Sequence, residues 1–434
     1  MRTKNRHNLL PGVLFFLTLL TLLIAQIHAQ ALTMPKNTFE VQGPEPSQTP
    51  SPSVSEWTYQ EKIKEGLALI EKNKPVLKVG VNDIIFYERR IIQNNGLVSI
   101  AKKQMHEPER DVALVLLNTG TGKLNMITIN EKGDKLSPPP GYKIAFVERT
   151  NGIKKNVWNT QRTVIEPSDT IVLLNVWPHF VTKTVPRSIK TKNGKTKTIY
   201  ETKKTVENVV YSPYGDGLHV PELIEAGREH RASDVQTAFD FLRKRGVMSR
   251  AFPSKLLADV DVLRPEFFER LPLLEQTDYA EFLFDPKKAL ERVDVIIGAN
   301  GDNAYAPSCS HAGACGYVQF TRGTYMAMDR KYPSARLMKD FETGAGDHIN
   351  STMAAILLFD YNLVGYLDEF GQSILNDPDQ LEEILDSSYN GNPVHAHRSL
   401  NASILQGLDD WITKYLRPET KGYMVKLRYI RDNY

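Results

Sequence analysis

The chain has 434 residues, of which 41% are hydrophobic and 24% are charged, and its formal net charge is +3. These values are those of an ordinary globular protein whose length suggests two or three domains with ample core. The mild positive charge gives no reason to expect a nucleic-acid partner, and we expect no cofactor.

Residues 1–29 have the features of a secretory signal peptide. A basic start with Arg2, Lys4 and Arg6 precedes an apolar core over residues 13–24, and small residues precede a plausible cleavage site at Ala29. The apolar core is too short to be a dependable membrane span. We therefore expect an exported protein, periplasmic or secreted, with no stable membrane insertion after the signal is removed. Residues 30–55 are rich in Pro, Ser, Thr and Gln and are expected to form a disordered linker.

Residues 56–214 are predicted to form a β-rich domain. An amphipathic helix is expected over residues 56–74, and short β-branched runs at 112–117, 143–147 and 170–176 predict strands. Asn193-Gly194 predicts a tight hairpin over residues 188–200. Its lysines could contact an anionic polymer or discourage edge aggregation; they are Lys190, Lys192, Lys195 and Lys197. The role of this domain remains open.

Residues 215–434 are predicted to be mainly helical, which makes the chain an α+β protein. One helix should begin at Pro221, and a second should cover residues 233–245, where the letters SDVQ have the pattern of a capping box. Residues 286–297 predict a buried helix that ends in a loop rich in Gly, Asn, Pro and Ser over residues 301–313. Asp347 is expected to cap the apolar helix that follows it, and His348 to be an ordinary hydrogen-bonded polar residue.

Three segments in this region share a resemblance to one family. Residues 310–319 read SHAGACGYVQ, residues 388–391 read SYNG, and residues 419–423 read ETKGY. They resemble the Ser-x-x-Gly-Ala-x-Gly-Leu-Met-Gln, Ala-Tyr-Asn-x-Gly and Glu-Thr-x-x-Tyr motifs of the lytic transglycosylases, the soluble type with a lysozyme-like domain of the glycoside hydrolase family 23 kind. Three matches in the family's order predict a lysozyme-like domain over residues 215–434.

The resemblance implies a peptidoglycan lytic transglycosylase, or a goose-type lysozyme relative, that cleaves the bond between N-acetylmuramic acid and N-acetylglucosamine. Peptidoglycan glycan strands would then be the partner, and the sequence identifies no protein partner. Tyrosine rings can stack on sugar faces and amides can bind sugar hydroxyls. The substrate-binding residues implied by the motifs are Ser310, Gln319, Tyr389, Asn390 and Tyr423.

The family's essential glutamate has no counterpart on this alignment. In the family a glutamate ends the helix before the loop, and the position that corresponds to it here is Ala299. Cleavage of a glycosidic bond needs a carboxylic acid that protonates the leaving oxygen, and Asp302, in the loop, is a poor substitute. An engineered Glu-to-Ala change, a natural inactive protein and a misplaced alignment all remain open. The alternative function is therefore a catalytically inactive peptidoglycan-binding protein of the cell envelope.

The two cysteines of the chain, Cys309 and Cys315, both lie at this loop. In an oxidising compartment they could form a short disulfide that stiffens it, or they could be two small buried residues. Metal binding is the least favoured reading because two cysteines with the neighbouring His311 are an incomplete ligand set. No metal is expected.

Overall fold

The computed structural model describes residues 57–91, 98–132, 135–147, 159–190, 193, 196–306, 308–310 and 313–434. The predicted signal peptide and linker lie outside the described residues. Glu56–Tyr434 form one compact unit. None of the described helices is long and apolar enough to span a bilayer.

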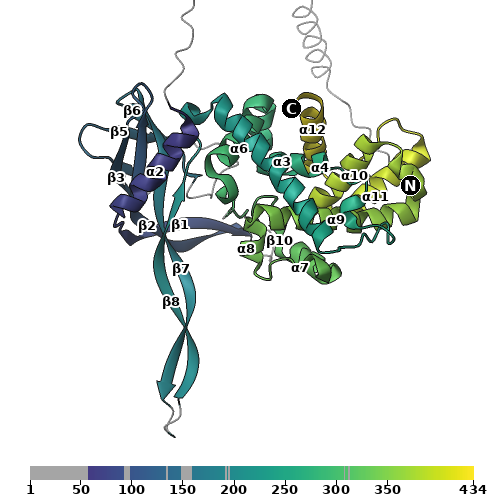
Figure 1. The fold of residues 1–434 in the computed structure, drawn as a ribbon, viewed down its shortest axis with the longest axis horizontal. Coiled ribbons are helices and arrows are strands. Elements are labelled where there is room, and N and C mark those ends of the chain that lie inside the picture. The colour runs from purple at the N-terminus through teal and green to yellow at the C-terminus, as the bar shows by residue number, and fades with distance from the viewer. Residues whose placement is uncertain are drawn as a thin grey trace, which may run out of the picture. The chain divides into compact units, whose positions relative to one another are not determined.

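The strands form one large antiparallel sheet and two small ones, with the order β4-β3-β2-β7-β8 in the large sheet and β1 also paired with β2 (Figure 1). The strands are β1 (Val79–Ile91), β2 (Val98–Asn118), β3 (Leu124–Lys132), β4 (Lys135–Ser137), β5 (Lys143–Phe146), β6 (Arg162–Glu166), β7 (Thr170–Lys190), β8 (Thr196–Tyr211), β9 (Ala314–Cys315) and β10 (Phe320–Thr321).

The helices follow the large sheet in the chain, apart from α2, which precedes it. They are α2 (Tyr59–Asn73), α3 (Pro221–Lys244), α4 (Pro265–Gln276), α5 (Tyr279–Phe284), α6 (Pro286–Asn300), α7 (Arg322–Lys331), α8 (Phe341–Gly346), α9 (His348–Phe370), α10 (Pro378–Gly391), α11 (Pro393–Gln406) and α12 (Pro418–Asn433). This mixture of helices and strands agrees with the predicted α+β class.

The central part of β2 is buried on both faces of the sheet. Its residues Val112 to Leu117 are at most 1% exposed, and alternate side chains of a strand point to opposite faces. Ala113, Val115 and Leu117 belong to the core shared with the helices, whereas Val112, Leu114 and Leu116 belong to a second core on the other face. This explains why the sequence shows an unbroken apolar run there instead of an alternating pattern.

Helix α2 connects the sheet to the helical region. Thr58 and Glu61 form a capping box at its start, and its buried face lies against β7 and β2. The backbone N–H groups of Tyr59 and Gln60 donate to the carboxylate of Glu222 in the first turn of α3, both at 2.9 Å. The β-rich segment and the helices therefore share one continuous core.

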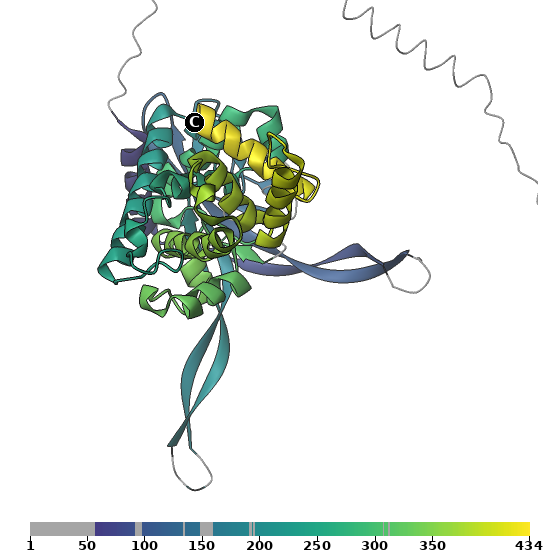
Figure 2. The same cartoon turned by 90° about the vertical axis from the view of Figure 1, so that its right-hand side faces the viewer.

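The hairpin predicted around Asn193-Gly194 is present and is much longer than expected. Strands β7 and β8 pair from Asn175 with Tyr211 to Lys190 with Thr196. Their distal part leaves the sheet as a two-stranded ribbon, and the paired β1 and β2 form another (Figures 1 and 2). Lys192 and Lys195 lie outside the described residues.

The predicted break between two helices before Ser233 is wrong, because α3 runs unbroken from Pro221 to Lys244. Asp234 therefore caps no helix, and its carboxylate instead lies 2.9 Å from the Nδ1 atom of His348. The predicted cap at Asp347 is confirmed, since its side chain accepts from the backbone N–H of Asn350 at the start of α9.

Candidate functional site

A cavity of about 420 Å³ lies between the end of α4, α6, the loop before β10, the end of α10 and the start of α12. Four of the five residues expected to bind substrate line it, although they come from three distant parts of the chain. They are Ser310, Gln319, Asn390 and Tyr423. The cavity also contains a carboxylate that the sequence analysis did not single out, that of Glu275.

Glu275 is the second-last residue of α4, and it is half-buried at the cavity. The hydroxyl of Tyr423 donates to its Oε1 atom at 2.7 Å. Burial raises the pKa of the Glu275 carboxyl from 4.5 to about 7, while the hydrogen bond from Tyr423 and the charge of Lys426 act in the lowering direction. A carboxyl with this pKa is partly protonated at neutral pH, which suits a general acid.

Lys426, on α12, donates hydrogen bonds to the backbone at the end of α4. Its buried ammonium donates to the carbonyl oxygen of Thr277 at 2.8 Å and to that of Leu274. A cation is favourable at this end of a helix because unsatisfied carbonyl groups give it negative character. Burial lowers the pKa of Lys426 to about 8. The end of α4, which carries Glu275, is therefore stabilised by the ammonium of Lys426, whose pKa burial has lowered toward neutral pH.

The loop with Gln319 is fixed against α4 by several hydrogen bonds. Nε2 of Gln276, the residue after Glu275, donates to the carbonyl oxygens of Gly316 and Tyr317 at 3.0 and 2.8 Å. Gln319 has φ of +51°, unusual for a residue with a side chain, and its Nε2 donates to the Gly316 carbonyl at 2.9 Å. Such strained backbone persists only where the surroundings hold it, and it is found most often at functional sites.

Gly316 is indispensable to this loop. Its φ is +81°, and a Cβ atom added there would lie 1.8 Å from the carbonyl oxygen of Ala345. Tyr389 also supports the loop, because its hydroxyl donates to the Val318 carbonyl at 2.5 Å. Tyr389 does not line the cavity, so the structure gives its ring a packing position beside the cleft. The predicted pair Cys309 and Cys315 is joined by a disulfide next to the same loop.

The two positions considered for the missing acid lie elsewhere. Ala299 is only 8% exposed within α6 and does not line the cavity. The Asp302 side chain is 85% exposed and forms an ion pair with His230 at 3.2 Å. The last turn of α6 is tied to the end of the sheet, where the Asn300 side chain bonds both backbone groups of Ser212 at 2.8 and 2.9 Å. Neither Ala299 nor Asp302 lines the cavity, whereas three carboxylates do, those of Glu275, Asp278 and Glu419. Glu275 is the one of them that lies at the end of α4.

One end of the cavity is polar, and its residues Arg292 and Asn159 were not predicted from the sequence. The guanidinium of Arg292 pairs with Glu281 at 2.8 Å, and its side chain is 6% exposed. Its Nε and Nη1 atoms have no hydrogen-bond partner among the residues that the structure describes. Asn159, from the β-rich segment, accepts from the Tyr214 N–H at 3.0 Å, and its Nδ2 likewise has no partner within the described ranges. These donors can hold oxygen atoms of a ligand.

The cavity thus combines a partly protonated carboxyl, a tyrosine hydroxyl bonded to it, amides of Gln319 and Asn390, and a buried guanidinium. This set can bind a polar, oxygen-rich chain and deliver a proton to one of its oxygens. Comparison with protein-family models, curated proteins and solved structures finds no match to this chain.

Proposed function

We propose that this protein is an exported peptidoglycan lytic transglycosylase in which Glu275 is the catalytic acid. In this proposal a β-rich domain precedes a lysozyme-like helical domain that holds the glycan strand. The observation that carries the proposal is the buried Glu275 carboxyl, with a pKa of about 7, hydrogen-bonded to Tyr423 in a cavity that Gln319 and Asn390 also line. The motif resemblance expects the acid at the end of the helix directly before the loop, which is α6, so the proposal for Glu275 at the end of α4 departs from the family pattern and is based on the geometry of the cavity.

The chemistry needs one group that acts twice. Protonated Glu275 gives its proton to the glycosidic oxygen, and the bond from that oxygen to the anomeric carbon of the muramic acid residue breaks. The resulting carboxylate then takes the proton of the sugar's own 6-hydroxyl, whose oxygen attacks the anomeric carbon. The product has a 1,6-anhydro end, and Glu275 has regained its proton. A pKa near the working pH serves both steps.

Retaining hydrolysis would need a second carboxylate about 5 Å from the first. The other acidic residues at the cavity are Asp278 and Glu419. Asp278 is engaged as the cap of α5, where it accepts from two backbone N–H groups at 2.9 and 3.1 Å. Glu419 is then the candidate second carboxylate, and the end group of the product, anhydro or reducing, decides between the two mechanisms.

The cleft offers donors for the acetamido and hydroxyl oxygens of the glycan. Asn390 uses its Oδ1 to accept from Thr420 at 3.0 Å, which leaves its amide N–H groups for a ligand. Arg292 and Asn159 add donors at the other end of the cavity. The alternative of an inactive peptidoglycan-binding protein depends on the alanine at position 299, and Glu275 in the cavity is a second candidate for the acid.

The test is digestion of purified peptidoglycan by the mature chain, followed by mass spectrometry of the muropeptides. The wild type is expected to release 1,6-anhydro products, and Glu275→Gln to be slower by a factor of about 100 or more. Asp261→Asn, an 88% exposed carboxylate that does not line the cavity, is the control and should cut at the wild-type rate. Equal cutting by Glu275→Gln would refute the assignment of the acid. Products with reducing ends would indicate hydrolysis by the same acid, and a wild type that binds without cutting would favour the binding protein.

A further inference from the structure

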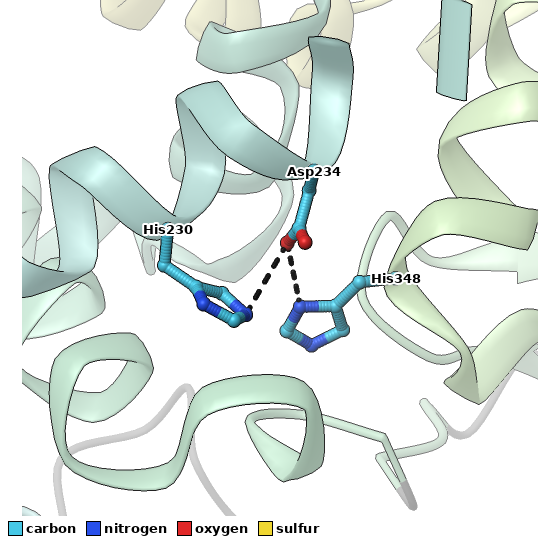
Figure 3. A group of neighbouring side chains, drawn as sticks. All are labelled: His230, Asp234 and His348. Atoms are coloured by element: carbon cyan, nitrogen blue, oxygen red, sulfur yellow. Dashed lines mark hydrogen bonds and ion pairs between the residues drawn. The ribbon is translucent and has the colours of Figure 1, made fainter. Parts of the chain in front are cut away.

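Away from the cleft, three metal-ligating side chains meet where α3 passes the start of α9. His230 and Asp234 lie one turn apart on α3, and His348 is the first residue of α9 (Figure 3). The Oδ2 atom of Asp234 lies 3.5 Å from Nε2 of His230 and 2.9 Å from Nδ1 of His348. One ligand atom from each of the three residues lies within 4.8 Å of the other two.

The hydrogen bonds of His348 determine which of its atoms carries a proton. Its Nε2 lies 2.7 Å from the carbonyl oxygen of Ala304, which can only accept. Nε2 therefore carries a hydrogen, and in the neutral ring Nδ1 presents a lone pair to the carboxylate of Asp234. Two acceptors at 2.9 Å repel each other unless a cation, either a proton or a metal ion, lies with them.

His230 places a third possible metal-ligand atom, its Nε2, beside the Asp234 carboxylate. Its Nε2 is buried and has no hydrogen-bond partner in the described part of the chain. The nearest arginine along α3, Arg231, does not neutralise Asp234, because it is bound to Asp294 at 2.7 Å. Within the described residues, the ion pairs of Asp234 are with His230 and His348 alone.

We propose that His230, Asp234 and His348 form a site for a divalent transition-metal ion of the zinc class. Imidazole nitrogens and a carboxylate oxygen are ligands that such ions take at about 2.0–2.2 Å. Tetrahedral bonds of that length set ligand atoms about 3.3–3.5 Å apart, and the 2.9 and 3.5 Å distances in the cluster bracket this spacing. The Ala304 carbonyl orients His348 as an outer hydrogen-bond acceptor does for a metal-bound histidine.

Asp302 is a candidate for a fourth ligand. Its Oδ1 lies 3.2 Å from His230 Nε2, and its side chain is 85% exposed and can turn a second carboxylate toward the ion. From the sequence no metal was expected, because the two cysteines with His311 are an incomplete ligand set and His348 was expected to be an ordinary hydrogen-bonded residue. The histidines that meet here are 118 positions apart in the chain, as their numbers show.

The position of the site gives the ion a structural role. The ring of His348 stacks on that of Tyr317 with centroids 3.6 Å apart. Tyr317 belongs to the loop that carries Gln319 into the cleft. A bound ion would fix His348 and thereby hold Tyr317, so that the loop is clamped to α3 and α9.

The test is metal binding to the mature full-length chain, with Zn²⁺ and Co²⁺ as probes after treatment with a chelator. Calorimetry and elemental analysis should find one Zn²⁺ per chain, and Co²⁺ should give the visible absorption of a site with nitrogen and oxygen ligands. Zn²⁺ should also raise the melting temperature. His230→Gln should weaken Zn²⁺ binding by a factor of about 100 or more and abolish the melting shift.

The matched control is His397→Gln, because His397 also pairs with a carboxylate, Glu369, at 2.6 Å, and its side chain is 20% exposed. It should bind Zn²⁺ as the wild type does. The proposal is overturned if the wild type takes up no Zn²⁺ at micromolar concentrations, or if His230→Gln binds as tightly as the wild type. Either result means that a proton holds the cluster together. Circular dichroism of each variant shows that it is folded, and the wild-type result decides the question without any variant.

Discussion

Replacing Glu275 by glutamine should make the protein more stable at neutral and alkaline pH while it removes the proposed acid. The pKa of the carboxyl is about 7 in the folded protein and near 4.5 when the chain is unfolded. Between these values the folded state binds more protons than the unfolded state, so the contribution of Glu275 to stability is complete below pH 4.5 and is lost as the pH rises to about 7. At 1.36 kcal/mol per pKa unit, the loss is about 3 kcal/mol.

Glutamine has nearly the same shape and cannot ionise, so its contribution does not change over this range. We expect the free energies of unfolding of Glu275→Gln and the wild type to be similar near pH 4.5. By pH 8 the free energy of unfolding of the variant should exceed that of the wild type by about 3 kcal/mol. Urea denaturation of both proteins at several pH values measures this difference. A difference in unfolding free energy that stays constant within about 1 kcal/mol from pH 4.5 to 8 would refute the buried, protonated carboxyl.

Three further changes test the surroundings of Glu275. Tyr423→Phe removes the donor that favours the ionised carboxyl, so the fall in activity at high pH should move to higher pH; an unmoved pH–rate profile contradicts this role. Gly316→Ala should lower the free energy of unfolding by more than about 4 kcal/mol or prevent folding. Gly313 has a φ of +78° and nothing within 4 Å of an added Cβ, so Gly313→Ala should lower it by only about 1–3 kcal/mol. Equal losses for the two variants in urea denaturation would contradict the close contact at Gly316. Lys426→Met leaves two carbonyl groups without their donor and should destabilise the fold by about 1–3 kcal/mol for each; a denaturation midpoint like that of the wild type would be evidence against this role.

Local patterns were sufficient to predict much of the fold. The run at residues 112–117 is β-branched and apolar, and it forms the middle of β2. The hairpin predicted around Asn193-Gly194 is present, since β7 and β8 pair as far as Lys190 and Thr196. Its length was not predicted, because the expected hairpin covered only residues 188–200. The break expected before Ser233 was wrong because a capping pattern inside a helix has no effect when the surrounding core favours continuation.

The cleft was predictable only in part. The motif residues Gln319, Asn390 and Tyr423 are brought together although they are far apart in sequence. Glu275 was missed because α5 and α6 intervene between it and the loop, so that an acid sought directly before the loop falls at Ala299. From sequence alone, a glutamate at the end of an apolar helix that faces a cavity cannot be told from one that faces solvent. Only the tertiary structure, which brings Glu275 into contact with Tyr423 at the cavity, makes it a candidate for the acid.

If Glu275 is the catalytic acid, the glycan must bind with its scissile bond at Glu275. The most direct measurement is a crystal structure of Glu275→Gln with a bound peptidoglycan fragment longer than two disaccharides. We expect a glycosidic oxygen within hydrogen-bond distance, about 2.6–3.2 Å, of the side chain at position 275, with Gln319 and Asn390 on the acetamido groups. A fragment bound away from this cavity, or with its glycosidic oxygens out of reach of residue 275, would contradict the account.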